Sequence, residues 1–297
     1  MKFGADCHFN IGAEHVSGGK PCQDYAISGN HDGIAFAIVS DGCSGGGNTD
    51  VGARLITLSA AAAIREHWDI EKNVTDASTA QAIEVRRRMV LGGIKETLKL
   101  ERDDMLATEL YVCLTSKGGY VHVWGDGVVA FVYVGGRIKL HRLDWPKSTP
   151  FYPSYIDSND VPGFIDEHGG DVASPVLCEQ VYEYVPAPED RLSATSTVFH
   201  SIVDGIKGIH FPITADELNQ LAFVVVFSDG VTRMDNVDWK DAALDLLNFK
   251  TATGVFAKRR MINFVREVRK KGRGPLDDIA FGVVSIVHDS EEVADGD

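Results

Sequence analysis

Three apolar runs that each end in Asp-Gly constrain this chain more than any other feature of its sequence. IAFAIVSDG ends at Gly42, LAFVVVFSDG ends at Gly230, and the weaker copy VHVWGDG ends at Gly127. Each run predicts a buried β-strand with a carboxylate at its end, because Gly permits a sharp turn away from the strand. Strand ends that converge could gather these carboxylates around a cation. Asp-Gly is also a frequent hairpin turn, so the alternative interpretation is three ordinary turns.

The composition is that of a globular protein with a sizeable core. Of the 297 residues, 44% are hydrophobic, and the longest apolar stretch, around 55–64, is too short to cross a bilayer. The N-terminus MKFGADCHFN lacks the apolar segment of a secretory signal, which indicates a cytoplasmic location and no membrane partner. The net charge of −14 argues against nucleic acid as a partner, because phosphate backbones attract Lys and Arg. Five widely spaced Cys residues fit neither a disulfide framework nor a zinc site.

The first half of the chain alternates between strand and helix patterns. Strand-like segments cover 1–12 and 24–40, and a helix begins at Thr49 and continues through LITLSAAAAIREHW. A second helix is expected from Ser78 to about Leu100. The region 108–142 predicts a meander of four strands separated by Gly-containing turns.

The second half begins with 144–177, which has no clear periodicity and predicts a long irregular loop. The strand VLCEQVYEYV, a mixed region and the strand that ends at Asp229 follow. Asp238 is expected to cap a helix, a further helix covers about 255–271, and IAFGVVSIV is the last strand. We expect a single domain over 1–290 and a disordered tail over 291–297. Helix pairs that alternate with antiparallel strands favour an α+β fold with helices outside packed sheets.

Six Asp residues that open or close predicted strands indicate a cation site built from oxygen ligands. No His-Glu-x-x-His motif, Cys cluster or Ser nucleophile elbow accompanies them. Oxygen ligands alone select hard cations such as Mg²⁺ or Mn²⁺ rather than zinc. Two such ions about 3.5–4 Å apart can hold a hydroxide and polarise a phosphoryl group, which suits the hydrolysis of phosphate esters. The six residues are Asp24, Asp41, Asp126, Asp229, Asp277 and Asp278.

Five motifs around these residues make the chain resemble a known family. They are GAEHVSGGKPCQD at 12–24, VSDGCSGGG at 39–47, VWGDG at 123–127, FSDGV at 227–231 and LDDIAF at 276–281. The set resembles the metal-dependent Ser/Thr protein phosphatases of type 2C, and most of all their bacterial branch. The motifs come in that family's order and spacing and extend over nearly the whole chain.

The resemblance implies a four-layer αββα sandwich, in which two antiparallel sheets are flanked by helix pairs and two metal ions lie between the sheet ends. It implies that Asp41 bridges two Mn²⁺ or Mg²⁺ ions and that the Gly42 carbonyl binds one of them. Asp229 and Asp277 would complete the shell of the other ion.

The same resemblance assigns the remaining acidic residues. Asp24 would hold a metal ion or its water, and Asp126 with Asp229 would form a weaker site for a third ion. Asp278 would support the ligands. The implied catalytic residues are therefore Asp41, Asp229, Asp277 and, as a further candidate, His15.

The function implied by the resemblance is the hydrolysis of phosphoserine and phosphothreonine in proteins by a water that bridges the two ions. The partner would be a phosphorylated protein, the target of a Ser/Thr kinase, and 144–177 would be a flap that shapes substrate access. One alternative is a regulatory module of the same fold that binds phosphoproteins with weak or no activity. Another is a phosphoesterase for small molecules.

Several positions depart from the family pattern. Gln23 replaces the Glu of a Glu-Asp pair, Gly127 replaces a Ser after the Asp, and Ala280 replaces a Thr. These changes leave the expected ligands in place.

The phosphate-binding Arg of the family is also missing, and Gly19 occupies roughly its place. The nearest cationic candidates are His15 and Lys20. His15 could steer phosphate or protonate the leaving alkoxide, since an imidazole can act as a general acid, or it could be an exposed loop residue.

Overall fold

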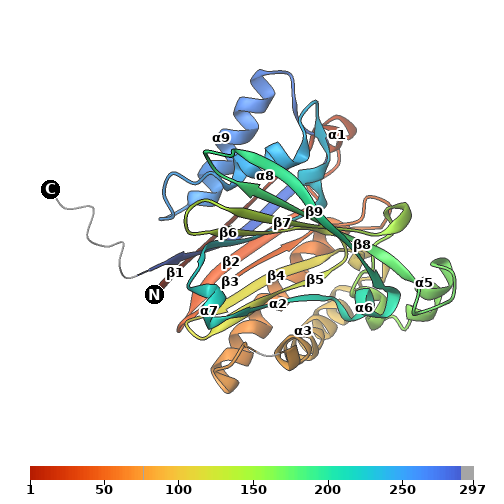
Figure 1. Ribbon diagram of the computed structural model, residues 1–297. Helices are drawn as coiled ribbons and strands as arrows, with labels where there is room; N and C mark the ends of the chain where they lie inside the picture. The colour runs from red at the N-terminus through yellow and green to blue at the C-terminus, as the bar shows by residue number, and fades with distance from the viewer. Residues whose placement is uncertain (76, 289–297) are drawn as a thin grey trace.

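The computed structural model describes residues 1–75 and 77–288, and two antiparallel sheets form its centre (Figure 1). The expected tail 291–297 lies outside the described residues. The larger sheet has seven strands, in the order β1 (Lys2–Asn10), β14 (Ile279–Val287), β11 (Leu221–Phe227), β6 (Gly127–Tyr133), β7 (Ile138–Asp144), β8 (Pro175–Val185) and β9 (Arg191–Ser201).

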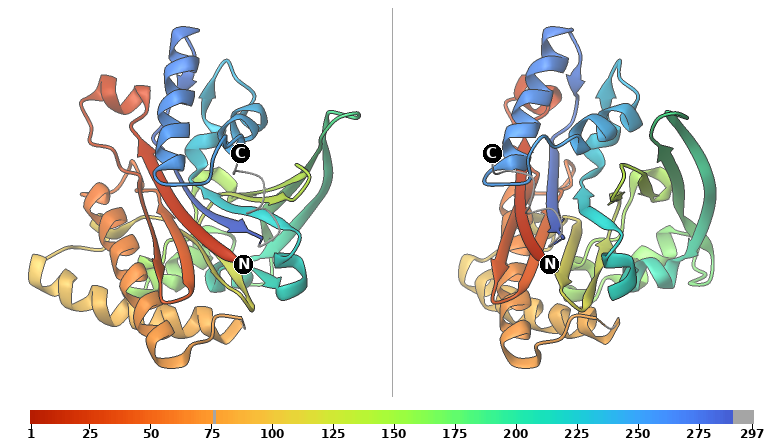
Figure 2. Two further views of the ribbon diagram at one scale, coloured as in Figure 1. Left: turned by 90° about the vertical axis from the view of Figure 1, so that its left-hand side faces the viewer. Right: turned by 60° about the vertical axis from the view of Figure 1, so that its left-hand side comes forward.

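The smaller sheet packs against one face of the larger sheet. Its five strands are, in order, β10 (Ile209–Thr214), β5 (Gly118–Trp124), β4 (Glu109–Thr115), β3 (Ile34–Ser40) and β2 (Tyr25–His31). A separate two-stranded ladder joins β12 (Met234–Asp235) to β13 (Gly274–Pro275). The hairpin of β8 and β9 extends away from the rest of the larger sheet (Figure 2).

Two helix pairs cover the outer faces of the sheets (Figures 1 and 2). Helices α2 (Thr49–Glu71) and α3 (Ala77–Leu98) pack on the smaller sheet, and α8 (Trp239–Leu247) and α9 (Phe256–Lys270) pack on the larger one. A separate hydrophobic core fills the space between the sheets. This arrangement of helix, sheet, sheet and helix confirms the predicted four-layer αββα fold.

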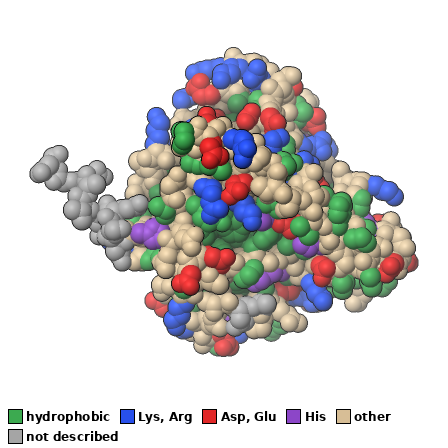
Figure 3. Space-filling view, in the orientation of Figure 1, with side chains coloured by type: hydrophobic (Ala, Val, Ile, Leu, Met, Phe, Trp, Pro, Cys, Tyr) green, Lys and Arg blue, Asp and Glu red, His purple; other side chains and the backbone are tan. Residues whose placement is uncertain are grey.

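The outer helix pair α8 and α9 shows how the sequence produces this layering. The Asp238 side chain accepts a hydrogen bond from the Lys240 backbone N–H at 2.9 Å, so it caps α8 as predicted. Helix α9 buries Met261 and Phe264 on one face, whereas its charged residues point outward. In the space-filling view, Lys and Arg side chains gather over α9 at the top of the molecule (Figure 3).

The four strands predicted over 108–142 are present, but the prediction that they form one meander is wrong. Strands β4 and β5 pair in the smaller sheet, whereas β6 and β7 pair in the larger one. The chain crosses between the sheets at Asp126, where Gly125 and Gly127 have φ angles of 101° and 141°. Such angles strain residues with a Cβ, so the two glycines permit the crossing. Asp126 therefore lies where the two sheets meet rather than in a hairpin.

The prediction of an irregular loop over 144–177 is wrong in part. This segment contains η2 (Pro146–Ser148), α4 (Ser154–Asp157) and α5 (Val161–Glu167). Its aromatic side chains form a buried cluster, in which the Phe164 ring lies 5.1 Å from the Phe151 ring and 5.2 Å from the Trp145 ring. Aromatic burial orders the segment without a periodic pattern, which explains why the sequence did not reveal it.

The remaining helices are short and join the larger elements. They are α1 (Ala13–Gly18), η1 (Asp103–Met105), α6 (Ile202–Lys207), α7 (Ala215–Leu218) and η3 (Asp229–Thr232). Within residues 1–75 and 77–288, no helix has both the length and the apolar character needed to span a bilayer.

Candidate catalytic site

Four carboxylates from the ends of strands line one cavity of about 200 Å³. Asp41 follows β3 of the smaller sheet, and Asp229 and Asp277 adjoin β11 and β14 of the larger sheet. Asp126 comes from the crossing between the sheets. Acidic residues almost two hundred positions apart are thus brought together because their strands end at the same edge of the sandwich.

None of the three Asp-Gly pairs is a hairpin turn, so that alternative interpretation is wrong. Gly42 forms an isolated antiparallel bridge to Ala107, and Gly230 lies in η3. A Cβ on Gly230 would lie 1.7 Å from the Asp278 carbonyl oxygen, and one on Gly42 would lie 2.7 Å from the Thr49 carbonyl oxygen. These two glycines are required because neighbouring backbone segments approach closely.

Asp24 lies beneath the cavity, at the start of β2, and is only 1% exposed. Its Oδ2 accepts a hydrogen bond from the Ser228 hydroxyl at 2.6 Å. Its Oδ1 is buried and accepts no hydrogen bond from the described residues. A buried carboxylate oxygen without a donor is costly, and a cation would satisfy it.

Burial and mutual repulsion disfavour the charged form of these acids. Burial raises the pKa of the Asp24, Asp41 and Asp126 carboxyls well above their usual range, and it also raises that of Asp229. Neighbouring carboxylates add to the effect, since Asp24 and Asp229 both raise the pKa of Asp41. The cavity therefore carries an electrostatic strain that bound cations would relieve.

A buried hydrogen-bond network beside the cavity centres on Asp278, which is 2% exposed. Its Oδ1 accepts a hydrogen bond from the Gly12 N–H at 2.7 Å, and its Oδ2 accepts one from the Gln23 N–H at 2.6 Å. His15 Nδ1 lies 2.7 Å from the same Oδ2. Asp278 thus anchors the segment 12–23 against the start of β14. The expectation that it supports metal ligands stays a prediction.

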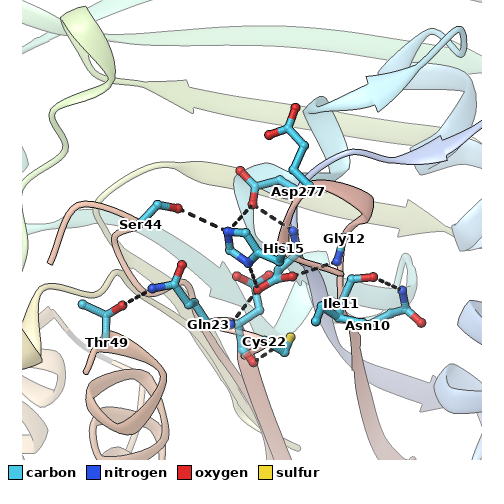
Figure 4. A network of polar contacts seen from close by, with 12 residues as sticks. Asn10, Ile11, Gly12, His15, Cys22, Gln23, Ser44, Thr49 and Asp277 are labelled. Carbon is cyan, nitrogen blue, oxygen red and sulfur yellow. Dashed lines mark hydrogen bonds and ion pairs between the residues drawn. The ribbon is translucent and has the colours of Figure 1, made fainter. Parts of the chain in front are cut away.

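His15 is in α1 and is 6% exposed, so the interpretation as an exposed loop residue is wrong. Its Nε2 lies 3.4 Å from the Ser44 hydroxyl and 3.7 Å from Asp277 Oδ1 (Figure 4). With Asp278 on Nδ1, the imidazole is held on both sides, and Nε2 faces two residues that line the cavity.

Arg233 is a further residue of this site, and the sequence motifs did not predict it. Its side chain is 48% exposed, lines the cavity, and has Nε 3.3 Å from Asp277 Oδ2. Lys20, one of the two proposed replacements for the missing Arg, is exposed and does not line the cavity. The only sequence indication was that Arg233 follows Ser-Asp-Gly-Val-Thr at the end of β11, where η3 brings it back over the acids.

The oxygen donors around the cavity are of the chemical type that binds a hard divalent cation. They include the carboxylates of the four Asp residues that line the cavity and the unsatisfied Asp24 Oδ1. In the part of the chain that the structure describes, however, no three His, Cys, Asp or Glu side chains are grouped as closely as metal ligands. The residues therefore surround a common cavity without forming a closed ligand cluster.

The chain belongs to the protein phosphatase 2C family, which it matches over residues 11–266. The resemblance seen in the sequence motifs is thereby confirmed. No curated protein sequence matches the chain.

Solved structures of bacterial phosphatases share the fold. The S. agalactiae serine/threonine phosphatase is 14% identical with a TM-score of 0.55, covering 96% of this chain and 100% of that one. Serine/threonine phosphatase Stp1 from Staphylococcus aureus is 10% identical with a TM-score of 0.51, covering 97% and 96%. The Mycobacterium tuberculosis serine/threonine phosphatase PstP/Ppp is 14% identical with a TM-score of 0.50, covering 97% and 100%. At these identities the likeness shows the architecture alone.

Proposed function

We propose that this chain hydrolyses phosphoserine and phosphothreonine in proteins, with two Mn²⁺ or Mg²⁺ ions as cofactors. Membership of the family and the shared fold support phosphatase chemistry in general. The observation that carries the finer proposal is the set of partly buried carboxylates, drawn from both sheets, around one cavity that Arg233 also lines. The substrate would be a protein phosphorylated by a Ser/Thr kinase.

The acidic residues would hold the ions. Bound there, two divalent ions would lower the pKa of water and offset the negative charge of the phosphoryl group. A weaker third ion would be held by Asp126 with Asp229. The ligands of the first two ions would be Asp24, Asp41, Asp229, Asp277 and the Gly42 carbonyl.

Two further side chains would act on the substrate. The Arg233 guanidinium, at the exposed wall of the cavity, would bind and orient the phosphate in place of the missing family Arg. His15, with Nδ1 against Asp278, would present Nε2 to the leaving oxygen of the serine or threonine and supply its proton.

Phosphatase assays on the purified chain test this proposal. We expect Mn²⁺-dependent release of phosphate from p-nitrophenyl phosphate and from phosphoserine or phosphothreonine peptides, abolished by Asp41→Asn. The matched control is Asp216→Asn on the exposed α7, which should keep full activity. Turnover of phosphorylated metabolites but not of phosphopeptides would replace the protein substrate with a small one.

The second candidate function is a phosphoprotein-binding module without catalysis. The absence of a closed ligand cluster among the described residues favours it. Such a module would bind a phosphopeptide in isothermal titration calorimetry, with or without Mn²⁺, and release no phosphate. Turnover that Asp41→Asn abolishes would exclude it.

A further inference from the structure

A second cavity, of about 550 Å³, lies on the outer side of the smaller sheet, away from the carboxylates. Its walls come from α3, from β5 and β10, and from α4 and α6, and Figure 1 shows α3 and α6 at this side of the molecule. The volume lies in the range of about 300–1,000 Å³ that is typical of small-molecule sites. None of the residues that line the first cavity lines this one.

His122 is the unusual residue in the wall of this cavity. It is 4% exposed, and both of its ring nitrogens are buried without a hydrogen-bond partner among the described residues. Burial, with a smaller effect from His210, lowers the pKa of His122 to about 3, so the ring is neutral at pH 7. A neutral imidazole offers one donor and one acceptor, and leaving either unmet in a buried position is unfavourable.

Aromatic rings surround His122 on the same wall. The Trp124 ring lies 4.3 Å away and the His210 ring 6.0 Å away. Trp124 donates its own N–H to the Ile206 carbonyl at 3.0 Å, so its hydrogen bond is already made. A planar ring would find stacking partners here, and His122 would supply the directional contact.

The charges around the cavity are mostly paired, with one exception. On α3, Arg88 Nε lies 2.9 Å from Glu84 Oε1 and 3.1 Å from Asp157 Oδ1 of α4. Lys207 is exposed at the rim and forms no ion pair with the described residues. The titratable groups that face the His122 ring are His210 on β10, Tyr111 on β4, and Glu84 and Arg88 on α3.

We propose that this cavity is a binding site for a small planar aromatic acid. The aromatic ring would lie against His122 and Trp124, a polar atom of the ligand would bond the imidazole, and the carboxylate would pair with Lys207. This proposal does not depend on the function of the first cavity.

Binding of 2-naphthoate, followed by ligand-observed NMR and calorimetry on the full chain, tests the proposal. We expect a Kd of about 1 mM or tighter, as usual for a ligand of this size. Cyclohexanecarboxylate, which has the acid without a planar ring, should bind at least about 10-fold more weakly, because stacking is lost. Equal binding of the two acids, or no binding of 2-naphthoate to the folded chain, would overturn the proposal.

Two substitutions on one helix locate the site. Val85 lines the cavity and is 51% exposed, so Val85→Trp should fill the entrance and weaken 2-naphthoate binding at least about 10-fold. Met89, on the same helix, is 76% exposed and does not line the cavity, so Met89→Trp should leave binding unchanged. Both positions are at the surface, and near-ultraviolet circular dichroism checks that each variant is folded. Equal effects of the two substitutions would place the bound acid elsewhere and reject the site.

His122→Phe then tests the directional contact. Phe keeps a planar ring of similar shape but removes both nitrogens, so we expect about 10-fold weaker binding, the usual effect of one lost hydrogen bond. Unchanged affinity in this variant would contradict the assigned role of the imidazole.

Discussion

At the level of single residues, Arg233 and His15 stand out because they place a guanidinium and an imidazole beside a cavity lined by carboxylates. Arg233 reaches the cavity from the exposed side, whereas His15 is buried between Asp278 and Ser44. Their different exposure predicts different effects on substitution. Arg233 should contribute to substrate binding with little effect on folding, and His15 should affect both.

Arg233→Ala should lower kcat/KM for phosphopeptides about 10- to 100-fold, because a charge-assisted hydrogen bond to phosphate is worth about 1.5–3 kcal/mol. Arg233→Lys should recover only part of this loss, since an ammonium cannot bind phosphate through two parallel hydrogen bonds. Steady-state kinetics with Mn²⁺ measure the effect, with Arg266→Ala on the exposed face of α9 as control. Equal kcat/KM for the alanine variant and the wild type would remove Arg233 from the site.

The buried His122 is a second single residue whose environment predicts a measurable effect, in this case a dependence of stability on pH. Its folded-state pKa of about 3 lies below the usual value of about 6.5, so the unfolded chain binds more protons between these values. Titration of His122 therefore lowers the free energy of unfolding as the pH falls below 6.5, and the decrease reaches about 2 kcal/mol at pH 5. Urea denaturation at pH 7.5 and pH 5 should show a smaller loss in His122→Phe. The same loss in both proteins would contradict the buried, unpartnered state of the ring.

At the level of elements, the start of β14 meets the segment 12–23 through two adjacent acids in different environments. Asp277 has a partly exposed side chain in the cavity, whereas Asp278 is buried and accepts hydrogen bonds from two backbone N–H groups. Asp277 therefore faces the cavity, whereas Asp278 attaches α1 to the start of β14.

Asp278→Ala should destabilise the fold by about 3 kcal/mol, because it leaves the Gly12 and Gln23 amides buried without acceptors. Asp277→Ala should abolish activity and cost much less stability. Urea denaturation and hydrogen exchange over 12–23 measure the difference. Comparable stability of the two variants would show that Asp278 does not anchor this segment.

Sequence patterns predicted the elements but not how they pair. The runs that end at Asp41 and Asp229 are uniformly apolar, as buried strands are, so their acids could be placed at strand ends. Local periodicity does not determine the sheet that a strand joins, and the crossing at Asp126 was therefore missed. Arg233 was missed for a similar reason, since only the path of η3 brings it to the cavity.

At the level of the whole molecule, the acidic cavity couples stability to pH. Folded-state pKa values raised above the unfolded value of about 3.9 mean that the native state binds more protons. In the absence of divalent ions, protonation of these acids therefore stabilises the folded state fully below about pH 4. This stabilisation is lost as the pH rises through the folded-state pKa values.

Asp41→Asn should therefore raise the melting temperature of the metal-free protein at pH 8, by about 2–4 °C for each kcal/mol of repulsion removed. Mn²⁺ at 100 times its Kd should add about 2.7 kcal/mol to the free energy of unfolding of the wild type and so raise its melting temperature. The same concentration should raise the melting temperature of the variant much less. Differential scanning fluorimetry with and without Mn²⁺ measures both effects. A wild-type melting curve unaffected by millimolar Mn²⁺ would count against metal binding in this cavity.

The strand order of the larger sheet also has a consequence for biosynthesis. Because β14 lies between β1 and β11, β1 has no ladder partner in its sheet until β14 has been made. Asp277 comes just before β14 in the chain, so the last of the acids that line the cavity is made immediately before this strand. A growing chain that has not reached β14 would therefore lack both the partner of β1 and one wall of the acidic cavity.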